Sequence, residues 1–414
     1  MRKFVLILLA VCLILGGVTG YLTARHVMAG SEESVSLYDP ESITWDDAED
    51  PTLTDVQGTE NGAIVIRQLD LDALHALCGD EEIVGNVDGS EVTWEEYFYW
   101  LADMGTQAQS YIMTMAYYGQ SLDWNDQLSS DSEQTFAEYV VEMAQECVRQ
   151  LNTIETVAEE NGVTLSEESL AGLQEKLEQD ILDLCGEGAD EETFNAYLAE
   201  NNISRGMYDR LNRVSFLFND IYTALYGEDG ANITEEDALA YLNENNYLCA
   251  GHILFLTIDP NTYEAVGEEE IAQKLAQAEA VSAELRAIED PDERAARFAE
   301  LKEQYCEDTG REMYPEGYLF VPGEMVTEFE DAVKGMEDYQ VSEPVLSAWG
   351  YHVIMRLPLD VDMTLEYNDA GAAISAREKY ANALFNELLG GRIEGSTLTL
   401  RDDIAAIDLT DYLD

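Results

Sequence analysis

The distribution of proline constrains the fold of this 414-residue chain more than any other feature of its sequence. None of the eight prolines lies between Pro51 and Pro260, and the last six lie from Pro260 to Pro358. Proline interrupts a helix because it lacks the backbone N–H group and clashes with the preceding turn. The proline-free stretch therefore favours helices, and the proline-rich stretch favours a compact domain with many turns.

Apolar residues in the proline-free stretch recur at the spacing of amphipathic helices. One stripe steps by three and four residues from Phe136 to Val157, and Gly162 follows it as a helix stop. Thr93 and Thr164 each precede a glutamate by three residues, which is the spacing of a capping box. Further helices are expected at 166–184, 191–200, 207–226 and 235–243.

Strands are expected on both sides of this boundary. Ahead of Thr93, "IVGNVDGSEVT" predicts a hairpin that turns at Asp88-Gly89. From residue 248, "LCAGHILFLTI" and "GYHVIMRL" predict strands, with helices between them at 268–287, 291–305 and 324–335. This β-α-α-α-β order predicts a small α/β domain. A further amphipathic helix at 374–389 is expected to end at Gly390-Gly391 and to precede a strand at 397–400.

The amino terminus indicates the cellular compartment. Arg2 and Lys3 precede an apolar run that extends to Leu22, near the ~20 residues that a helix needs to cross a bilayer. Basic residues ahead of such a run favour a cytoplasmic N-terminus, which places the bulk of the chain outside the cell membrane. An uncleaved anchor is favoured over a cleaved signal peptide, and lipidation at Cys12 is a third alternative. The acidic residues that follow predict a flexible linker up to residue 60.

The charge balance excludes one class of partner. With 85 acidic against 21 basic residues the formal net charge is -64, and such a surface repels the phosphate backbone of nucleic acids. The simpler interpretation of this charge is a solvated surface that resists aggregation. Weak cation binding and a preference for basic clients are the alternatives.

The cysteines indicate neither a disulfide framework nor a zinc site. Those outside the apolar run are odd in number and contain no C-x-x-C pair. Buried free thiols are expected, and a bridge between Cys249 and Cys306 is the alternative. The residues concerned are Cys78, Cys147, Cys185, Cys249 and Cys306.

Only four histidines occur in the chain, and two of them lie in the predicted α/β domain. His26 and His75 precede it. His75 is interpreted as packing on a helix face, because leucines lie four residues before, one before and two after it. His252 and His352 lie in the two terminal strands of the domain, within "AGHILF" and "WGYHVI".

These two strands belong to a set of motifs that resembles a known family. "GHILF", "EQYCEDTG", "GEMVTEFEDAV" and "VSEPVLSAWGYHVIMRL" are similar in order and spacing to the parvulin peptidyl-prolyl isomerases, in particular to the PrsA/SurA group of extracytoplasmic foldases. The resemblance covers about residues 247–357. "VGNVDGSEVTWEEYFYWL" is similar to the hairpin and helix that open the chaperone domain of those proteins. There the N-terminal helices pack with a helix that follows the isomerase domain, and the resemblance assigns 374–389 to that returning helix.

The resemblance also implies a set of site residues. The paired histidines of the family, and the position that it fills with Cys or Asp, fall on His252, His352 and Asp308. The positions that hold the prolyl ring, and those near the last histidine, fall on Leu319, Met325, Phe329, Ser347 and Trp349.

The chemistry of isomerisation suits these residue types. Rotation about a peptide bond meets a barrier of ~18–20 kcal/mol because the amide is stabilised by resonance. No bond breaks, so the resemblance implies neither a nucleophile, a metal nor another cofactor. An apolar shelf that excludes water favours the twisted amide over the planar one, and a buried polar network holds the other side of the site. The segment after His252 has no Lys or Arg up to residue 267, which argues against selection for phosphorylated Ser/Thr-Pro.

One departure from the family leaves three functions open. The glycine-rich stretch, commonly G-G-D-L-G-W-F, is shortened here to "PEGYLFVPGEM", which alters the rim of the pocket. The first interpretation is an extracytoplasmic isomerase and chaperone for secreted or envelope proteins. The alternatives are a membrane-tethered holdase with an inactive parvulin domain and, with less support, a scaffold in an envelope assembly.

The predicted fold class is α+β, a helical chaperone domain with an inserted parvulin-like α/β domain after an N-terminal transmembrane helix. Its expected parts are an anchor or signal over 1–24, a linker over 25–60, helices over 61–246, the isomerase domain over 247–358 and a returning tail over 359–414.

Overall fold

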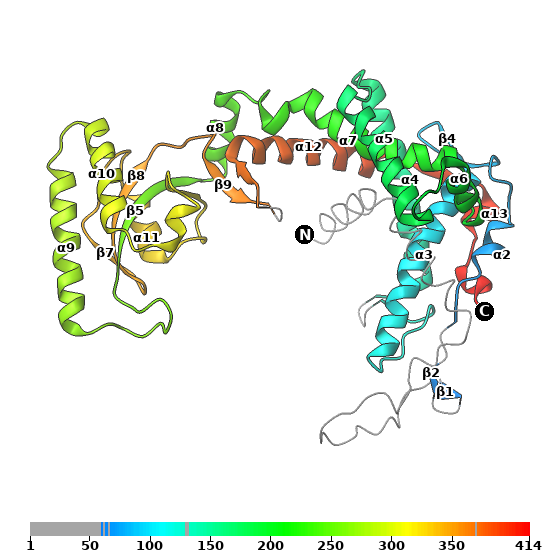
Figure 1. Cartoon of the computed structure of the whole chain (residues 1–414), viewed down its shortest axis with the longest axis horizontal. Helices are drawn as coiled ribbons and strands as arrows, with labels where there is room; N and C mark the ends of the chain where they lie inside the picture. The colour runs from blue at the N-terminus through cyan, green and yellow to red at the C-terminus, as the bar shows by residue number, and fades with distance from the viewer. Residues whose placement is uncertain (1–58, 61–62, 65–66, 129–131, 369–370) are drawn as a thin grey trace. The chain divides into compact units, whose positions relative to one another are not determined.

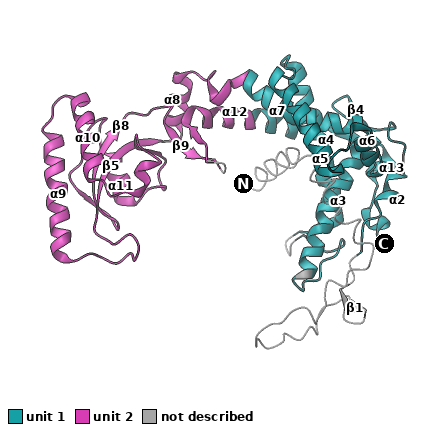
Figure 2. Ribbon diagram, in the orientation of Figure 1, with its two compact units in different colours: residues 1–224, 387–414 teal, residues 225–386 magenta. Residues whose placement is uncertain are grey.

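A computed structural model describes residues 59–60, 63–64, 67–128, 132–368 and 371–414 (Figure 1). These residues form two compact units, coloured separately in Figure 2: unit 1 contains residues 1–224 and 387–414, and unit 2 contains residues 225–386. The predicted anchor over 1–24, and the predicted linker up to residue 58, lie outside the described residues. No helix in the described part of the chain combines the length and the apolar character needed to cross a bilayer.

Unit 1 is built mainly from helices whose starts are capped by side chains. Thr93 caps α3 (Trp94–Tyr117) by accepting a hydrogen bond from the N–H of Glu96, and Thr135 and Glu138 form a capping box at α4 (Phe136–Glu160). The predicted apolar stripe of α4 is buried from Val140 to Val157 except at Met143, which is half-buried. The other helices of unit 1 are α2 (Leu71–His75), α5 (Glu167–Cys185), α6 (Glu191–Glu200), most of α7 (Arg205–Tyr226), α13 (Asp402–Ala405) and the 3-10 helix η3 (Leu409–Tyr412).

A small sheet connects the N-terminal and C-terminal segments of unit 1. The predicted hairpin is confirmed as β3 (Ile83–Val87) and β4 (Ser90–Thr93), with positive φ angles of 50° at Asp88 and 104° at Gly89. Strand β11 (Leu398–Leu400) pairs antiparallel with β3, so the C-terminal segment of unit 1 packs beside this hairpin. A separate two-stranded pair is formed by β1 (Thr59–Glu60) and β2 (Ala63–Ile64).

One predicted helix cap and one predicted helix end are wrong. Helix α5 is capped by Ser166, whose hydroxyl accepts from the N–H of Ser169, and not by Thr164. Helix α12 (Ala376–Gly395) continues through Gly390-Gly391 instead of ending there. Leu389 and Ile393 are both buried on either side of the glycine pair, so packing holds a helix that glycine alone would weaken.

Unit 2 contains a four-stranded antiparallel sheet in the order β6-β5-β8-β7. The central strands β5 (Leu248–Leu256) and β8 (Gly350–Leu357) are the two that the sequence predicts, and the edge strands β6 (Tyr318–Phe320) and β7 (Val345–Leu346) are additions. Helices α9 (Glu268–Arg286) and α10 (Pro291–Tyr305) pack on one face, against Ile253, Phe255 and Val353. Helix α11 (Thr327–Lys334) packs on the other, against Ala250 and Ile354.

The rest of unit 2 surrounds the end of this sheet. Helix α8 (Glu235–Glu244), the hairpin of β9 (Thr364–Tyr367) and β10 (Ala373–Ser375), and the start of α12 pack around a second core. Two 3-10 helices complete the unit, η1 (Glu228–Gly230) and η2 (Thr309–Glu312). The α+β class is confirmed, and unit 2 extends beyond the expected 247–358 at both ends.

Candidate functional site

The two central strands place His252 and His352 on one face of the sheet. In the register of β5 and β8, His252 pairs with Ile354 and Leu254 pairs with His352. The two histidines are therefore diagonal neighbours, because residues two apart on a strand share a face. Their Nδ1 atoms lie 3.0 Å apart, and both side chains are buried.

Asp308 extends this pair toward the loop after α10. Its Oδ2 lies 2.8 Å from Nε2 of His252 and also accepts a hydrogen bond from the hydroxyl of Tyr318 on β6. Its Oδ1 accepts from the N–H of Gly310 at 2.9 Å, because Asp308 caps the 3-10 helix η2. A Cβ at Gly310 would lie 2.6 Å from the Tyr318 hydroxyl oxygen, so glycine leaves the room for this contact.

Ser347 closes the network on the other side. Its Oγ lies 2.7 Å from Nε2 of His352 and accepts from the N–H of Trp349 at 3.1 Å. One assignment of protons satisfies the whole chain: Ser347 donates to His352, His352 donates through Nδ1–H to His252, and His252 donates through Nε2–H to Asp308. Each histidine then carries one proton and is neutral.

The electrostatics of the site agree with this assignment. Burial and the neighbouring His252 lower the pKa of His352 to about 3. Burial alone would raise the pKa of Asp308, but hydrogen bonds from His252, Tyr318 and the Gly310 N–H lower it well below its ordinary value. Burial and the bond to Asp308 raise the pKa of Tyr318 far above its ordinary range. At neutral pH the site therefore holds Asp308 as a carboxylate, His352 as a neutral imidazole and Tyr318 as a phenol.

An apolar wall faces the histidines. The ring of Phe329, on α11, stands edge-on to His252 at 5.5 Å between centroids and to His352 at 5.8 Å. With the loop before α11 it forms one side of a pocket of about 370 Å³. The pocket is lined by His252, Leu254, Leu256, Pro260, Glu307, Asp308, Thr309, Tyr318, Glu324, Met325, Val326, Phe329, Trp349 and His352.

The structure brings most of the predicted site residues together. Six of them line the pocket: His252, Asp308, His352, Met325, Phe329 and Trp349. Ser347 lies behind His352 as a hydrogen-bond partner. Their roles in catalysis and binding remain predictions, because geometry alone does not measure activity.

Leu319 is the exception, and its assignment to the pocket is a correction. Its side chain packs in the second core of unit 2, with Leu242, Cys249 and Met363, and it does not line the pocket. Successive residues of a strand point to opposite faces, so Tyr318, one position earlier on β6, faces the site instead. The sequence signal for Tyr318 is this alternation, which becomes readable only once β6 is recognised as a strand.

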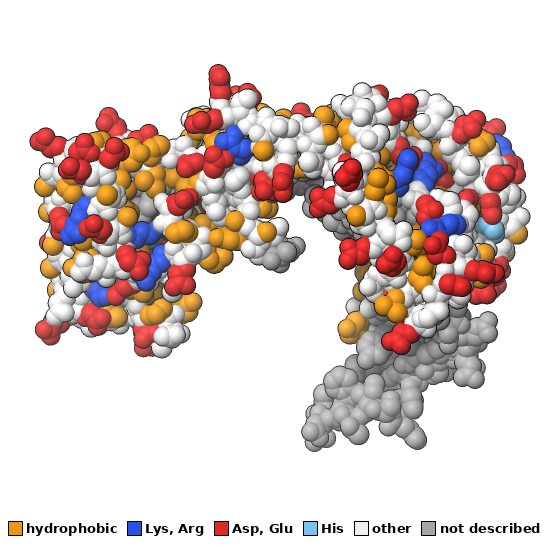
Figure 3. All heavy atoms as spheres, turned by 45° about the horizontal axis from the view of Figure 1, so that its top comes forward, with side chains coloured by type: hydrophobic (Ala, Val, Ile, Leu, Met, Phe, Trp, Pro, Cys, Tyr) orange, Lys and Arg blue, Asp and Glu red, His pale blue; other side chains and the backbone are white. Residues whose placement is uncertain are grey.

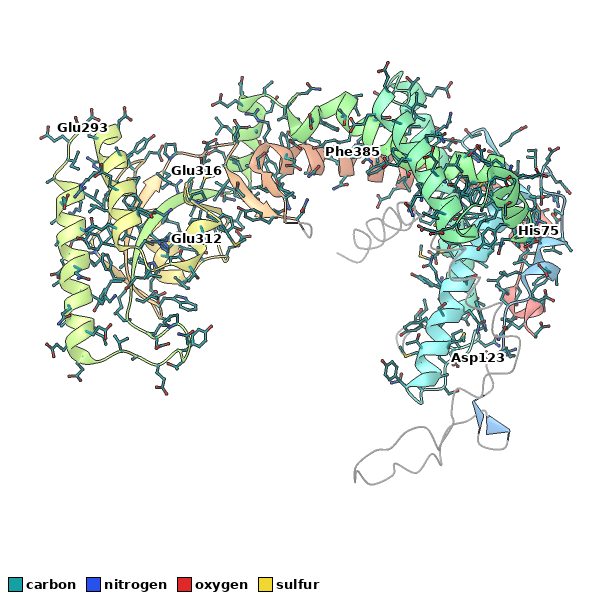
Figure 4. All side chains as sticks on the ribbon, viewed as in Figure 1. His75, Asp123, Glu293, Glu312, Glu316 and Phe385 are labelled. Atoms are coloured by element: carbon teal, nitrogen blue, oxygen red, sulfur yellow. The ribbon has the colours of Figure 1, made fainter. Side chains whose placement is uncertain are left out.

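Two other expectations concern side chains that do not line the pocket. Cys249 and Cys306 are free and buried, so the alternative of a bridge between them is wrong. His75 on α2, labelled in Figure 4, packs against Phe98 with ring centroids 4.7 Å apart. Its Nε2 lies 2.7 Å from Oδ1 of Asp80, and both contacts agree with helix-face packing. Nowhere in the described part of the chain do three or more His, Cys, Asp or Glu side chains gather as metal ligands would.

Comparison with known protein families identifies a rotamase domain. Residues 252–357, about a quarter of the chain, match the rotamase family described as the PPIC-type PPIASE domain. This span contains the two histidines, Asp308 and the whole apolar wall.

Among individual proteins the similar sequences are foldases. The chain is 50% identical over 58 residues to "Foldase protein PrsA 3" of Bacillus anthracis, which covers 14% of this chain and 20% of that protein. It is 36% identical over 133 residues to "Foldase protein PrsA" of Halalkalibacterium halodurans, covering 31% and 32%. It is 43% identical over 58 residues to "Chaperone SurA" of Chromohalobacter salexigens, covering 14% and 13%. The matched segments thus span a third or less of these relatives' own length.

Solved structures give a weaker global similarity. The structure of PrsA from Bacillus subtilis aligns with 66% of this chain and 91% of its own at a TM-score of 0.24 and 17% identity. That of PrsA from Bacillus anthracis aligns with 60% and 95% at a TM-score of 0.21 and 18% identity. Scores this low do not establish a common arrangement of domains, so the sequence matches carry the relationship.

Proposed function

We propose, from the parvulin-type rotamase domain that residues 252–357 form and from the PrsA and SurA foldases as its relatives, that this chain is a peptidyl-prolyl isomerase and folding chaperone. Its clients are secreted or envelope proteins outside the cytoplasmic membrane. The observation that supports the proposal best is the continuous network from Ser347 through His352 and His252 to Asp308, which backs a pocket with an apolar wall.

The pocket offers a physical route to faster rotation. The planar amide before proline has a larger charge separation than the twisted one, so water stabilises it more. Phe329 and Met325 form a surface against which a prolyl ring packs and from which water is excluded. Neutral His352 and ionised Asp308, joined through His252, present fixed dipoles to the amide without any reorganisation during rotation. No covalent intermediate is required.

Client holding is assigned to the helical region over 61–246 with the returning tail. Unit 1 exposes large apolar side chains, including Tyr111 at 48%, Tyr118 at 71% and Leu170 at 55% of their surface. Exposed apolar side chains of this size offer contacts to unfolded segments. Isomerisation and holding are therefore separable activities in one chain.

The test measures both activities in the purified full chain. We expect faster cis–trans exchange of an unphosphorylated X-Pro peptide than the uncatalysed rate, and loss of that acceleration in His252→Ala and His352→Ala. The two losses should not add, because both residues act in one network. Suppression of client aggregation should survive both substitutions.

The rival function is a holdase with an inactive isomerase domain, and the shortened loop "PEGYLFVPGEM" favours it. A wild-type chain that prevents aggregation while leaving the exchange rate unchanged would establish the holdase and end the isomerase proposal. Loss of both activities in the histidine variants would contradict their assignment to separate regions.

The location outside the membrane rests on the apolar run after Arg2 and Lys3. Protease added to intact spheroplasts should digest the folded units. Full protection until detergent is added would exclude this topology.

A further inference from the structure

The loop between β6 and α11 forms one wall of the pocket. Three successive residues of this loop, Glu324, Met325 and Val326, line it. The loop opens with a tight turn at Pro322-Gly323, in which Gly323 adopts a positive φ of 105°. Met325, which faces the prolyl ring in the proposed function, therefore depends on the conformation of a short, turn-rich segment.

A buried carboxylate holds this loop. Glu330, one turn into α11, is only 5% exposed, and its Oε1 accepts hydrogen bonds from the N–H of Gly323 at 2.6 Å and of Met325 at 3.1 Å. Its Oε2 lies 3.3 Å from Nζ of Lys334. Desolvation opposes ionisation, but the two backbone N–H groups and Lys334 lower the pKa of Glu330, so it holds the loop as a carboxylate.

We propose that Glu330 is a positioning residue for the pocket: it fixes the loop over 322–326 and thereby the position of Met325 relative to Phe329. The inference rests on the proposed function of the pocket. Phe329 precedes Glu330 on α11 and packs against both histidines. Helix α11 therefore contributes Phe329 to the apolar wall, and through Glu330 it also holds the loop that contributes Met325.

The energetic argument is that charge-assisted hydrogen bonds are about twice as strong as neutral ones. Two of them converge on one oxygen and fix the backbone on both sides of Glu324. Without Glu330, the N–H groups of Gly323 and Met325 lose these hydrogen bonds, and the loop is free to rearrange. A displacement of ~1 Å at a binding surface costs up to about a hundredfold in rate.

The experiment compares variants of the full chain with an X-Pro peptide as probe. Glu330→Ala should lower kcat/KM about tenfold, mainly through KM, because the surface for the prolyl ring is misplaced. Glu330→Gln should remain within about threefold of wild type, since its amide oxygen still accepts both N–H groups. Glu328→Ala is the matched control, because Glu328 is exposed on the same turn of α11.

A second readout separates positioning from general stability. Hydrogen–deuterium exchange at residues 323 and 325 should rise at least tenfold in Glu330→Ala, with exchange in α11 unchanged. Adding Met325→Ala to Glu330→Ala should cost little more than either alone, because both changes remove the same contact. If Glu330→Ala is too unstable to assay, Glu330→Asp, whose shorter side chain withdraws the carboxylate, makes the same comparison.

Three outcomes would overturn the inference: a loss no larger than that of Glu328→Ala, unchanged exchange at residues 323 and 325, or full additivity with Met325→Ala. A wild-type chain without isomerase activity would instead defeat the proposed function. In that case the affinity for the same peptide, measured by calorimetry, still tests Glu330.

Discussion

His352 combines deep burial with a role as both donor and acceptor. Ser347 and His252 each occupy one of its ring nitrogens, so a proton added at Nε2 would require the Ser347 hydroxyl to turn and accept the bond that it now donates. Burial and the neighbouring His252 keep the residue neutral in the folded protein, with a pKa of about 3.

The consequence is a stability that depends on pH. The pKa of His352 is about 3 in the folded state against an ordinary value of 6.5, so the unfolded chain binds the extra proton first. The contribution is fully present above pH 6.5 and is lost as the pH falls toward 3. Between pH 7.5 and 4.5, we expect the Tm of wild type to fall relative to that of His352→Gln, which cannot take up this proton.

The comparison with His352→Gln is needed because acidification also relieves the repulsion among 85 acidic residues, which acts in the opposite direction on both proteins. Differential scanning calorimetry at several pH values gives the two curves. Parallel curves across this window would show that His352 is not buried in its neutral form.

Tyr318 is the site residue that sequence reasoning missed, and its hydroxyl is testable alone. Tyr318→Phe removes one of the two donors to Oδ2 of Asp308 while keeping the ring. We expect kcat/KM for an X-Pro peptide to fall about three- to tenfold, since a hydrogen bond to a charged group contributes roughly 1.5–3 kcal/mol and part of it is recovered from water. Tyr367→Phe removes a hydroxyl bonded to the backbone of Met313 and is the control. Equal activity of wild type and Tyr318→Phe would remove Tyr318 from the site.

At the scale of elements, the ends of long strands and helices were predicted better than those of short ones. Strands β5 and β8 and helix α10 have the expected ends or nearly so, because each presents a long apolar pattern with clear caps or turns. The edge strand β6 has three residues, over which an alternation of period two carries no signal. The wrong assignment of Leu319 to the pocket follows from this, because the face of the sheet on which a side chain lies can be predicted only once the strand is recognised.

The path of α12 illustrates a different limit. Gly390-Gly391 predicts a helix end from local propensity, yet the burial of Leu389 and Ile393 extends the helix past the pair. An effect of tertiary packing on a helix end cannot be recognised in a single sequence. The six predicted residues that line the pocket, by contrast, could be identified from family motifs without a structure.

The tail provides a prediction at the same scale. Residues 396–414 pack against the rest of unit 1. Strand β11 pairs with β3, and the side chain of Leu409 is fully buried. The N–H of Asp414 donates a hydrogen bond to the backbone carbonyl of Gln68. Deleting 396–414 should therefore lower the free energy of unfolding of unit 1 by several kcal/mol, since it opens a sheet edge and leaves a cavity. Urea unfolding followed by near-UV signals of the tryptophans of unit 1 measures this.

The rotamase domain is the internal control for that deletion, since isomerase activity toward a short peptide should persist at temperatures where both proteins are folded. Unchanged stability after the deletion would show that the tail is dispensable for unit 1.

At the scale of the whole molecule, charge is the dominant property. The net charge is -64, and on the face shown in Figure 3 Asp and Glu side chains are spread over both units. The pocket is negatively charged as well: its described lining contains Glu307, Asp308 and Glu324 but no Lys or Arg. Lys274 pairs with Glu307, so Glu324 and Asp308 carry most of the unbalanced charge there.

This charge predicts which clients are favoured. A cation about 6 Å from a carboxylate in water gains roughly 0.7 kcal/mol, which is about a threefold change in an equilibrium constant. With two such carboxylates, peptides with Lys next to proline should show a kcat/KM about three- to tenfold higher than peptides with Glu there. Phosphorylated Ser-Pro should give no gain, because the phosphate meets charge of its own sign.

The ionic strength and the substitution Glu324→Gln distinguish the effect of charge at the pocket from that of charge on the whole surface. The preference for Lys over Glu should shrink as the ionic strength rises from 0.02 to 0.5 M, values chosen because the screening length falls from roughly 20 Å to about 4 Å over that range. Glu324→Gln should reduce the preference at low salt, whereas Glu293→Gln, on the exposed start of α10 and outside the pocket (Figure 4), should leave it unchanged. A preference for the Glu peptide, or equal rates for both at low salt, would show that the acidic surface is only a solvated shell and takes no part in choosing clients.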